Sequence, residues 1–149
     1  MFSIQTMLMT LAADWLISER RLAEEDFAKA QSMIDKLQRE VKDGALLSPL
    51  SVLTAEEAFK EYLLRKSGHS VLTRLWRQTV SQWWLLMNNY LRHENPAEIA
   101  RRLISDQQKV LEALQNEDRD NLRAQIAAAN ERCCARVKEV LKSAGNGDS

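Results

Sequence analysis

The sequence contains few of the residues that break helices and build turns. Only four glycines and two prolines occur in 149 residues, and no sustained alternation of apolar and polar residues predicts a strand. The pair Asp43-Gly44 follows a helical pattern, so we interpret it as a helix stop rather than a hairpin turn. With 45% hydrophobic and 28% charged residues, the composition favours one all-α domain that spans residues 1–149 and buries a core.

The sequence also has no excess of charge of either sign and no apolar run long enough to cross a membrane. Its 21 basic and 21 acidic residues cancel, whereas a domain that binds nucleic acid by itself usually carries a basic excess. The longest uncharged runs, residues 1–13 and 78–91, are shorter than the roughly 20 apolar residues of a membrane-spanning helix. We therefore expect a soluble, cytoplasmic protein that binds neither a membrane nor, by itself, DNA.

Cysteine and histidine are scarce, and the motifs of common enzyme sites are absent. The two cysteines, Cys133 and Cys134, are adjacent, which favours neither a disulfide nor a metal site and predicts one buried and one partly exposed thiol. His69 lies in a predicted turn and His93 at a predicted helix end, where structural roles are the ordinary ones. Because a phosphate-binding glycine loop, a nucleophile elbow and paired histidines are all missing, we expect neither an enzyme nor a bound cofactor.

Apolar residues recur at helical spacing along nearly the whole chain. Asn95 and Pro96 form a strong helix start, because asparagine caps a helix and proline suits its first position. A capping box that begins at Thr54 predicts another start, after a short apolar loop over residues 45–53 hinged at Pro49. These patterns predict an antiparallel bundle of about six helices, over residues 2–20, 23–44, 54–68, 70–91, 96–115 and 119–142.

The first and fourth predicted helices each have an inward face that can be specified residue by residue. In the first helix the expected stripe is Ile4, Leu8, Leu11, Trp15 and Ser18. In the fourth it is Leu72, Leu75, Trp76, Thr79, Trp83, Leu86, Met87 and Tyr90. Trp76 and Trp83 lie seven residues apart, a spacing typical of plain core, with the alternative that they form the wall of a cavity. Trp84 lies off this stripe and is a candidate interface residue.

Three polar residues fall on stripes that are otherwise apolar. Glu56 and Lys60 flank Phe59 on the third predicted helix, and Gln107 lies on the inward face of the fifth. Buried polar groups need partners, and unpaired buried charges are costly. One reading is that these side chains extend to solvent along a wider stripe. The other is a polar pocket inside the bundle, where helical bundles commonly hold ligands.

The order of motifs resembles a known family, the FCD type of effector-binding domain in the GntR family of bacterial transcription regulators. The stretch "ERRLAEEDFAKA" (residues 19–30) is similar to the junction of the family's first two helices. "EEAFKEYLLRKSGHSVLTRL" (56–75) resembles its Asp-x-x-Phe-His segment, the Ser-Gly-Asn turn and the following Leu-rich helix. "DQQKVLEALQNEDRDNLRAQIAAAN" (106–130) resembles its Glu-His-x-x-Ile-Leu-x-Ala-Ile segment and final helix. Together these matches cover nearly all of the chain.

The resemblance implies a pocket, but the family's metal ligands are changed. Many members hold a divalent metal with one aspartate and three histidines at the pocket floor. Here Glu56 stands at the aspartate position, and Lys60, Gln107 and Ala129 stand at the histidine positions. We therefore expect no metal. Our hypothesis is that the Lys60 ammonium replaces the dication, pairs with Glu56 and is hydrogen-bonded by Gln107.

The resemblance further implies a ligand-sensing and dimerising domain that reaches DNA only through a winged-helix domain, which the sequence does not contain. The sequence leaves open whether the chain is separated from that domain or stands alone. We expect a homodimer through the first and fourth helices, with a small organic acid or acyl effector. The candidate ligand-binding residues are Glu56, Phe59, Lys60, Trp76, Thr79, Trp83 and Gln107. Two alternatives are an acyl-chain or acyl-CoA-responsive domain and a ligand-free helical interaction domain.

Overall fold

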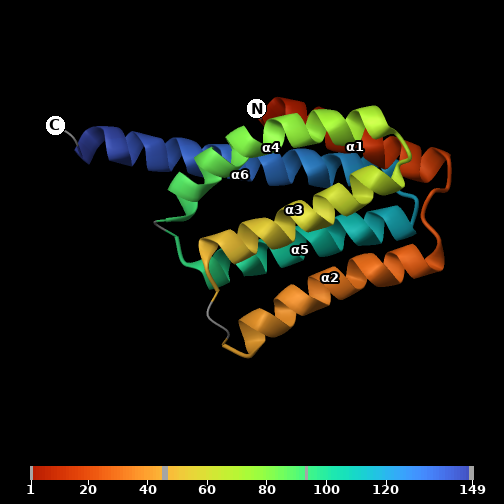
Figure 1. Cartoon of the computed structure of the whole chain (residues 1–149), viewed down its shortest axis with the longest axis horizontal. Coiled ribbons are helices and arrows are strands. Elements are labelled where there is room, and N and C mark those ends of the chain that lie inside the picture. Colours follow the sequence, from red (N-terminus) through yellow and green to blue (C-terminus); the bar gives the residue numbers. More distant parts are fainter. Residues whose placement is uncertain (1, 45–46, 93, 148–149) are drawn as a thin grey trace.

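The computed structural model describes residues 2–44, 47–92 and 94–147, and within these ranges the chain forms six α-helices and no strand (Figure 1). The helices are α1 (Phe2–Ser18), α2 (Glu24–Lys42), α3 (Pro49–Lys66), α4 (Ser70–Leu91), α5 (Pro96–Gln115) and α6 (Arg119–Gly147). The predicted all-α bundle is thus confirmed. In the part of the chain that is described, no helix is both long and apolar enough to cross a bilayer.

The start of α5 follows the predicted capping chemistry, and a left-handed glycine separates α3 from α4. The side chain of Asn95 accepts a hydrogen bond from the backbone N–H of Ala97 at 2.9 Å, and Pro96 occupies the first position of α5. Helix α4 has the predicted bounds, and Gly68, in the turn before it, has a φ of +81°. Glycine adopts this left-handed conformation without the steric penalty of a side chain. His69 follows in the same turn, where its ring lies 3.6 Å from that of Trp15 between centroids.

Helix α3 begins five residues before the predicted capping residue Thr54, so the predicted capping box is wrong. Ser48 caps the helix instead, its side chain accepting from the backbone N–H of Ser51 at 3.1 Å, and Pro49 takes the first helical position. Thr54 lies within the helix and donates to the carbonyl of Leu50. The loop predicted over residues 45–53 is helical from Pro49 onward, and residues 45–46 lie outside the described part.

The predicted inward stripe of α1 is also largely wrong. Leu8 is buried as expected, but Ile4 is 45% exposed and Leu11 is 39% exposed. The buried face consists of Gln5, Leu8, Met9, Ala12, Ala13 and Leu16. Helix α1 carries apolar residues on nearly all of its sides, so their periodicity does not single out one buried face. The observed face includes both small alanines, which allow α1 to approach its neighbours closely.

The core consists of two clusters that follow one another along the bundle. The larger includes Leu8, Ile34, Leu64, Trp76 and Leu111, and the smaller includes Leu37, Val52, Trp83, Met87 and Val137. Helix α2 packs mainly on α5, and α1 and α5 both pack on α6, as Figure 1 shows. Helix α6 extends past the bundle to Gly147, beyond the predicted end near residue 142. Members of both clusters line the cavity described below.

Candidate functional site

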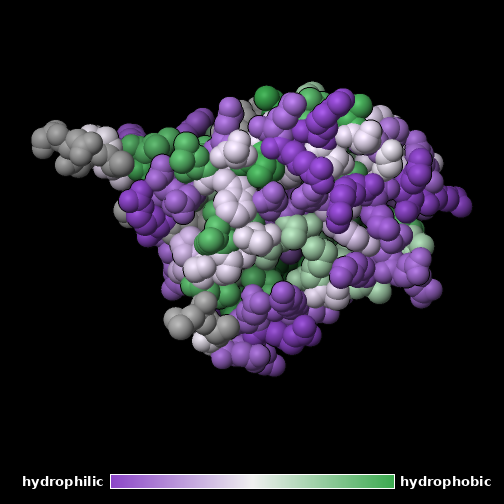
Figure 2. Space-filling view, viewed as in Figure 1, coloured by the Kyte–Doolittle hydropathy of each residue, from purple (hydrophilic) through white to green (hydrophobic). Residues whose placement is uncertain are grey.

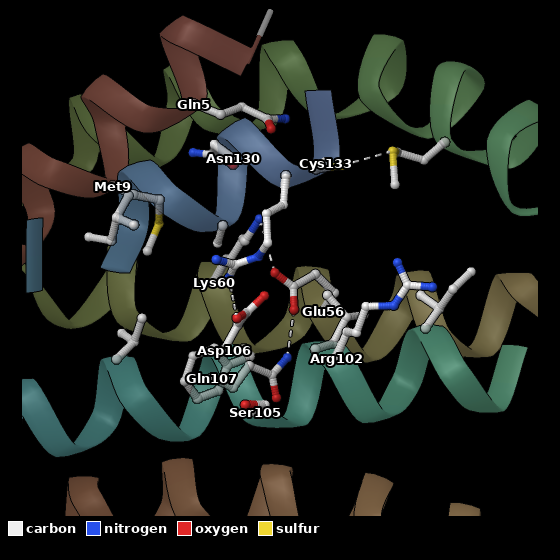
Figure 3. A pocket seen from close by; sticks show the side chains of 18 of the residues that line it. Gln5, Met9, Glu56, Lys60, Arg102, Ser105, Asp106, Gln107, Asn130 and Cys133 are labelled. Carbon is white, nitrogen blue, oxygen red and sulfur yellow. Dashed lines mark hydrogen bonds and ion pairs between the residues drawn. The ribbon is translucent and has the colours of Figure 1, made fainter. Parts of the chain in front are cut away.

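A cavity of about 390 Å3 lies inside the bundle and is lined by residues of α1, α3, α4, α5 and α6 (Figure 3). Its volume falls within the range that small-molecule sites occupy. Apolar side chains form much of its wall, among them Met9, Leu53, Phe59, Trp83, Met87 and Ile126. The site is therefore an apolar chamber, and the polar groups that enter it determine what it can bind.

Three polar side chains meet at the α3–α5 side of the cavity. The Lys60 ammonium lies 3.0 Å from the Glu56 carboxylate, one helical turn earlier. The Gln107 amide on α5 donates to the other oxygen of Glu56 at 2.6 Å. Glu56 is only 6% exposed, so these two contacts replace the water that burial removes from its charge. The predicted inward orientation and the Glu56–Lys60 pairing are confirmed, whereas Gln107 bonds Glu56 and not, as predicted, Lys60.

Lys60 lies close to two tryptophan rings of α4. Its ammonium is 5.6 Å from the centroid of Trp83 and 5.7 Å from that of Trp76. A cation at this distance from an aromatic ring is attracted by the negative face of the π system. The Lys60 side chain remains 20% exposed. Lys60 is thus held by Glu56 and the two rings while it still lines the cavity.

The candidate residues divide into those that line the cavity and those that lie outside its lining. Glu56, Phe59, Lys60, Trp83 and Gln107 line it. Trp76 is buried and contacts Lys60 from outside the lining. Thr79 is half-buried, donates to the carbonyl of Trp76 at 2.8 Å and is also not part of the lining. The Tyr90 side chain and His93 lie outside the described residues.

Trp84 is half-buried and donates its indole N–H to Glu57. This contact links α4 to α3 within the bundle. Trp84 also packs against the smaller core cluster. The structure thus gives Trp84 a role inside the chain, and its predicted role at an interface stays a prediction.

Basic residues of α5 and α6 add charge around the cavity, and sequence reasoning missed them. Arg102, Lys109, Arg132 and Arg136 line it together with Lys60, against two acidic residues, Glu56 and Asp106. Arg132 lies 2.6 Å from Asp106, and Arg136 lies 2.7 Å from Glu94. The lining thus carries more positive than negative charge, although the chain as a whole is neutral. Such a local excess favours anionic ligands.

Burial changes the acidity of two groups that line the cavity. It raises the pKa of the Asp106 carboxyl above its ordinary value, and the Arg132 guanidinium opposes that rise. Burial also raises the pKa of the Cys133 thiol to about 11. The Cys133 sulfur lies 3.7 Å from that of Met87. Contrary to the prediction of one buried thiol, Cys133 and Cys134 are both half-buried, and Cys133 is a protonated, weakly nucleophilic part of the wall.

Two amide side chains on the α1–α6 side were also missed. Gln5 is 1% exposed and lines the cavity, yet neither its Nε2 nor its Oε1 has a hydrogen-bond partner within the described ranges. Asn130 lines the cavity and donates to the hydroxyl of Thr6. The sequence signal for Gln5 was its position one turn before Met9 on the buried face of α1. The incorrectly predicted inward face of α1 did not include Gln5.

The four residues that the resemblance places at metal positions do lie together, but their chemistry does not fit a divalent ion. Glu56, Lys60, Gln107 and Ala129 all line the cavity. Glu56 is the single carboxylate among them, and its oxygens already contact an ammonium and an amide N–H. Ala129 has no donor atom, and zinc or a similar ion needs several ligands of the carboxylate, imidazole or thiolate type. Within the described residues, no group of three or more such side chains is placed to hold a metal.

Comparisons with known proteins agree with this architecture. A family model described as "FCD domain" matches residues 1–132. Among solved structures, E. coli McbR/YncC is similar, with a TM-score of 0.73 and 20% sequence identity. The match covers 93% of this chain and 60% of that chain, so the present chain spans less than two thirds of its length. No curated protein matches the sequence.

Proposed function

Because the chain belongs to the FCD domain family, we propose that it is the ligand-sensing and dimerising domain of a GntR-type transcription regulator and binds a small anion at Lys60. The family match covers residues 1–132 and so includes every candidate ligand-binding residue. It supports a regulatory rather than a catalytic role, which agrees with the absence of recognisable enzyme motifs in the sequence. The identity of the anion and the role of each residue are the parts that we propose.

The observation that carries this proposal is the Lys60 ammonium in the wall of a largely apolar cavity. A partly buried cation such as Lys60 attracts a ligand of opposite charge more strongly than a fully exposed one, because the surrounding dielectric constant is lower. Glu56 balances the charge of Lys60 in the free protein. The further basic groups Arg102, Arg132 and Arg136 then make the total lining positive. In this protein a fixed amine takes the place that a metal holds in many relatives.

The size and lining of the cavity favour a small organic acid. A volume of about 390 Å3 accommodates a compact metabolite. A long acyl chain would need an apolar path past Trp76, Trp83 and Met87, and Trp76 is not part of the lining. The presence of a cavity at Lys60 also counts against a purely structural interaction domain.

Apolar residues on the outside of α1 and α4 support the dimerising role. Ile4, Met7 and Leu11 are exposed on α1, and Val71 and Leu75 are exposed on α4, Leu75 contrary to its predicted inward orientation. Figure 2 shows apolar atoms along the upper edge of the molecule, where Figure 1 places these two helices. Exposed apolar patches of this kind commonly mark protein interfaces. We propose that two copies associate through this surface, which sedimentation analysis of the wild type and of Met7→Glu would test.

The proposed mechanism is a shift between helix arrangements. A ligand that contacts α1, α3 and α5 favours the arrangement in which these helices are closest to it. Across a two-fold dimer, such a change alters the separation of two attached DNA-reading domains. DNA binding in this scheme belongs to a separate winged-helix domain.

Thermal unfolding in the presence of candidate anions tests the proposal, since a ligand that binds only the folded state raises the melting temperature. The panel comprises small carboxylates, sugar acids and acyl thioesters. The informative variant is Glu56→Gln/Lys60→Met, which removes both charges of the buried pair and so leaves no buried charge unpaired. Lys138→Met, at an exposed position of α6 outside the lining, is the matched control.

We expect at least one anion to raise the melting temperature of the wild type and of the Lys138 variant but not that of the double variant. An equal response of all three proteins would show that the anion binds elsewhere. The proposal is contradicted if no anion in the panel changes the melting temperature of the wild type.

A further inference from the structure

A groove lies on the outside of the bundle, at the turn between α3 and α4, and basic residues line it. We call it the α3–α4 groove; its polar lining includes Arg65, Ser70, Thr73, Arg74 and Arg77. Within the described residues, no acidic side chain lines it. It shares no residue with the cavity at Lys60. The groove is thus a second concave site with a positive charge of its own.

Two of the three arginines in the groove have no ion-pair partner. Arg77 contacts the Glu61 carboxylate at 2.7 Å, so its charge is balanced. Arg65 and Arg74 are exposed, and neither forms an ion pair or a side-chain hydrogen bond with any described residue. Like charges that face one groove repel each other, and a bound group with two negative charges would balance both. A phosphate monoester carries a charge of about −1.5 to −2 at pH 7.

The Thr73 hydroxyl is a separate indication of a ligand. The Thr73 side chain is only 8% exposed and lines the groove. Thr54 and Thr79 each donate to a carbonyl of their own helix, whereas Thr73 makes no hydrogen bond within the described ranges. Its oxygen is also not among the fully enclosed polar atoms that lack a partner. The hydroxyl therefore retains accessible surface, and a group bound in the groove would give it a partner.

The first turn of α4 adds backbone donors to the same groove. Ser70 is the first residue of the helix and lines the groove. The backbone N–H groups of Ser70 and Val71 have no acceptor in the described part of the chain. Such groups at a helix start carry partial positive charge and bind phosphate oxygens. Positions 70, 73, 74 and 77 recur every three or four residues, so their side chains share one face of α4.

We propose that the α3–α4 groove binds the phosphate group of a small phosphorylated molecule. Arg65 and Arg74 balance its charge, and the Thr73 hydroxyl and the free N–H groups of α4 donate to its oxygens. The groove measures about 610 Å3, which leaves room for the remainder of such a molecule. The site is separate from the cavity, so the proposal does not depend on the anion proposed at Lys60.

The surroundings of the groove favour a single phosphate group over a long polyanion such as DNA. Glu61 lies beside Arg77, and Glu19 lies 3.6 Å from the ring of His69, so two carboxylates border the basic lining. A duplex that covered the groove would bring further phosphates close to these carboxylates. Binding of DNA also draws on a wide basic surface, whereas this chain has no net charge.

The test is a titration of the 15N-labelled protein with inorganic phosphate and with glycerol 3-phosphate, followed by NMR. Acetate at the same ionic strength is the monoanionic control. The informative variant is Arg65→Gln/Arg74→Gln, which removes two positive charges without breaking an ion pair. Arg39→Gln/Arg101→Gln is the matched control, because these arginines are also exposed and unpaired within the described ranges. They lie near the end of α2 and the start of α5, at the opposite end of the bundle (Figure 1).

We expect both phosphate probes to shift the backbone amide signals of Ser70 and Val71, and acetate to bind about tenfold more weakly or less. Arg65→Gln/Arg74→Gln should weaken phosphate binding about tenfold or more, whereas the control double variant should bind like the wild type. Thr73→Val keeps the shape of the side chain and removes the hydroxyl. It should weaken binding about threefold and melt no lower than the wild type, since the hydroxyl has no partner to lose.

The proposal is overturned if neither phosphate probe shifts these signals, or if acetate binds as tightly as phosphate. Equal weakening in the two arginine double variants would reduce the effect to general charge and reject the groove as a site. The cavity variant Glu56→Gln/Lys60→Met should bind phosphate like the wild type, and a loss there would place the phosphate in the cavity instead. A DNA duplex that binds through Arg65 and Arg74 while the small phosphates do not would replace the proposed ligand with nucleic acid.

Discussion

The Lys60 ammonium lies 3.0 Å from the carboxylate of Glu56, one turn earlier on the same helix, in the interior of the bundle. The order of the pair along α3 is the favourable one, with the acid nearer the N-terminus. Gln107 bonds the second oxygen of Glu56, so α3 and α5 are joined through this one carboxylate.

Removing the cation alone should destabilise the free protein. Lys60→Met leaves the buried carboxylate of Glu56 with Gln107 as its remaining partner, and we expect a loss of about 1–3 kcal/mol in the free energy of unfolding. Urea denaturation measures this loss. Glu56→Gln/Lys60→Met should recover most of it, because neither buried charge remains. A double variant as unstable as Lys60→Met would show that the methionine itself disrupts packing.

Two glycines should respond to alanine in opposite directions. Gly68 has a φ of +81°, and an added Cβ would lie 3.1 Å from the Arg21 guanidinium carbon, so Gly68→Ala should cost about 1 kcal/mol, mainly through backbone strain. Gly145 lies in α6 with open space around it, and Gly145→Ala should stabilise by roughly 0.5 kcal/mol. Thermal unfolding of both variants gives the signs, and a stabilising Gly68→Ala would contradict the left-handed turn.

Asp26 should make stability depend on pH in the acid range. The backbone N–H of Ala23, followed by the Lys66 ammonium, lowers the pKa of Asp26 below its ordinary value of 3.8. A carboxyl with a lowered folded-state pKa stabilises the protein above its unfolded-state pKa, and this contribution is lost as the pH falls through the lowered value.

The stability difference between the wild type and Asp26→Asn should therefore be constant above about pH 5 and shrink toward pH 2. Urea denaturation at a series of pH values measures this difference. A difference that does not change with pH would mean that the pKa of Asp26 is the same in the folded and unfolded protein.

Cys133 should alkylate slowly in the folded protein. Its pKa of about 11 leaves roughly 0.1% thiolate at pH 8, about a hundredfold less than an unperturbed thiol. Iodoacetamide labelling of a Cys134→Ser variant, followed by mass spectrometry, measures the rate of Cys133 alone. We expect that rate to rise about tenfold per pH unit up to pH 10 and to increase strongly in urea. Equal rates in the folded and unfolded protein would contradict the buried site.

Much of the fold could be predicted from local sequence signals. The start of α3 was predicted wrongly although its true signal is present in the sequence. Asn95-Pro96 correctly predicts the start of α5, because the side-chain cap and the proline are both local in effect. Ser48-Pro49 carries the same type of signal at the true start of α3. The start of α3 was predicted five residues too late, because the spacing of Thr54 and Glu57 also fits a capping box.

The face of α1 could not be predicted in the same way. Apolar residues such as Ile4, Leu8 and Leu11 lie on all sides of this helix. Which of them are buried depends on the helices that pack beside it. The position of Gln5 in the cavity wall therefore emerges only in three dimensions.

The residues of the candidate site could likewise be predicted only in part. Glu56, Lys60 and Gln107 could be predicted because each is a polar residue on an otherwise apolar stripe, and their contacts follow from burial. The arginines around the cavity could not, because Arg102, Arg132 and Arg136 lie on polar faces that look like ordinary solvated surface in the sequence. Their convergence depends on how α5 packs against α6.

Helix α1 joins two surfaces with different chemistry, and this has a mechanical consequence. Gln5 and Met9 enter the cavity, whereas Ile4 and Met7 point to the exterior. Neighbouring residues on a helix are separated by about 100° around its axis and are held by the same ladder of backbone hydrogen bonds. A displacement of α1 from the cavity side would therefore also move Ile4 and Met7 on its outer side.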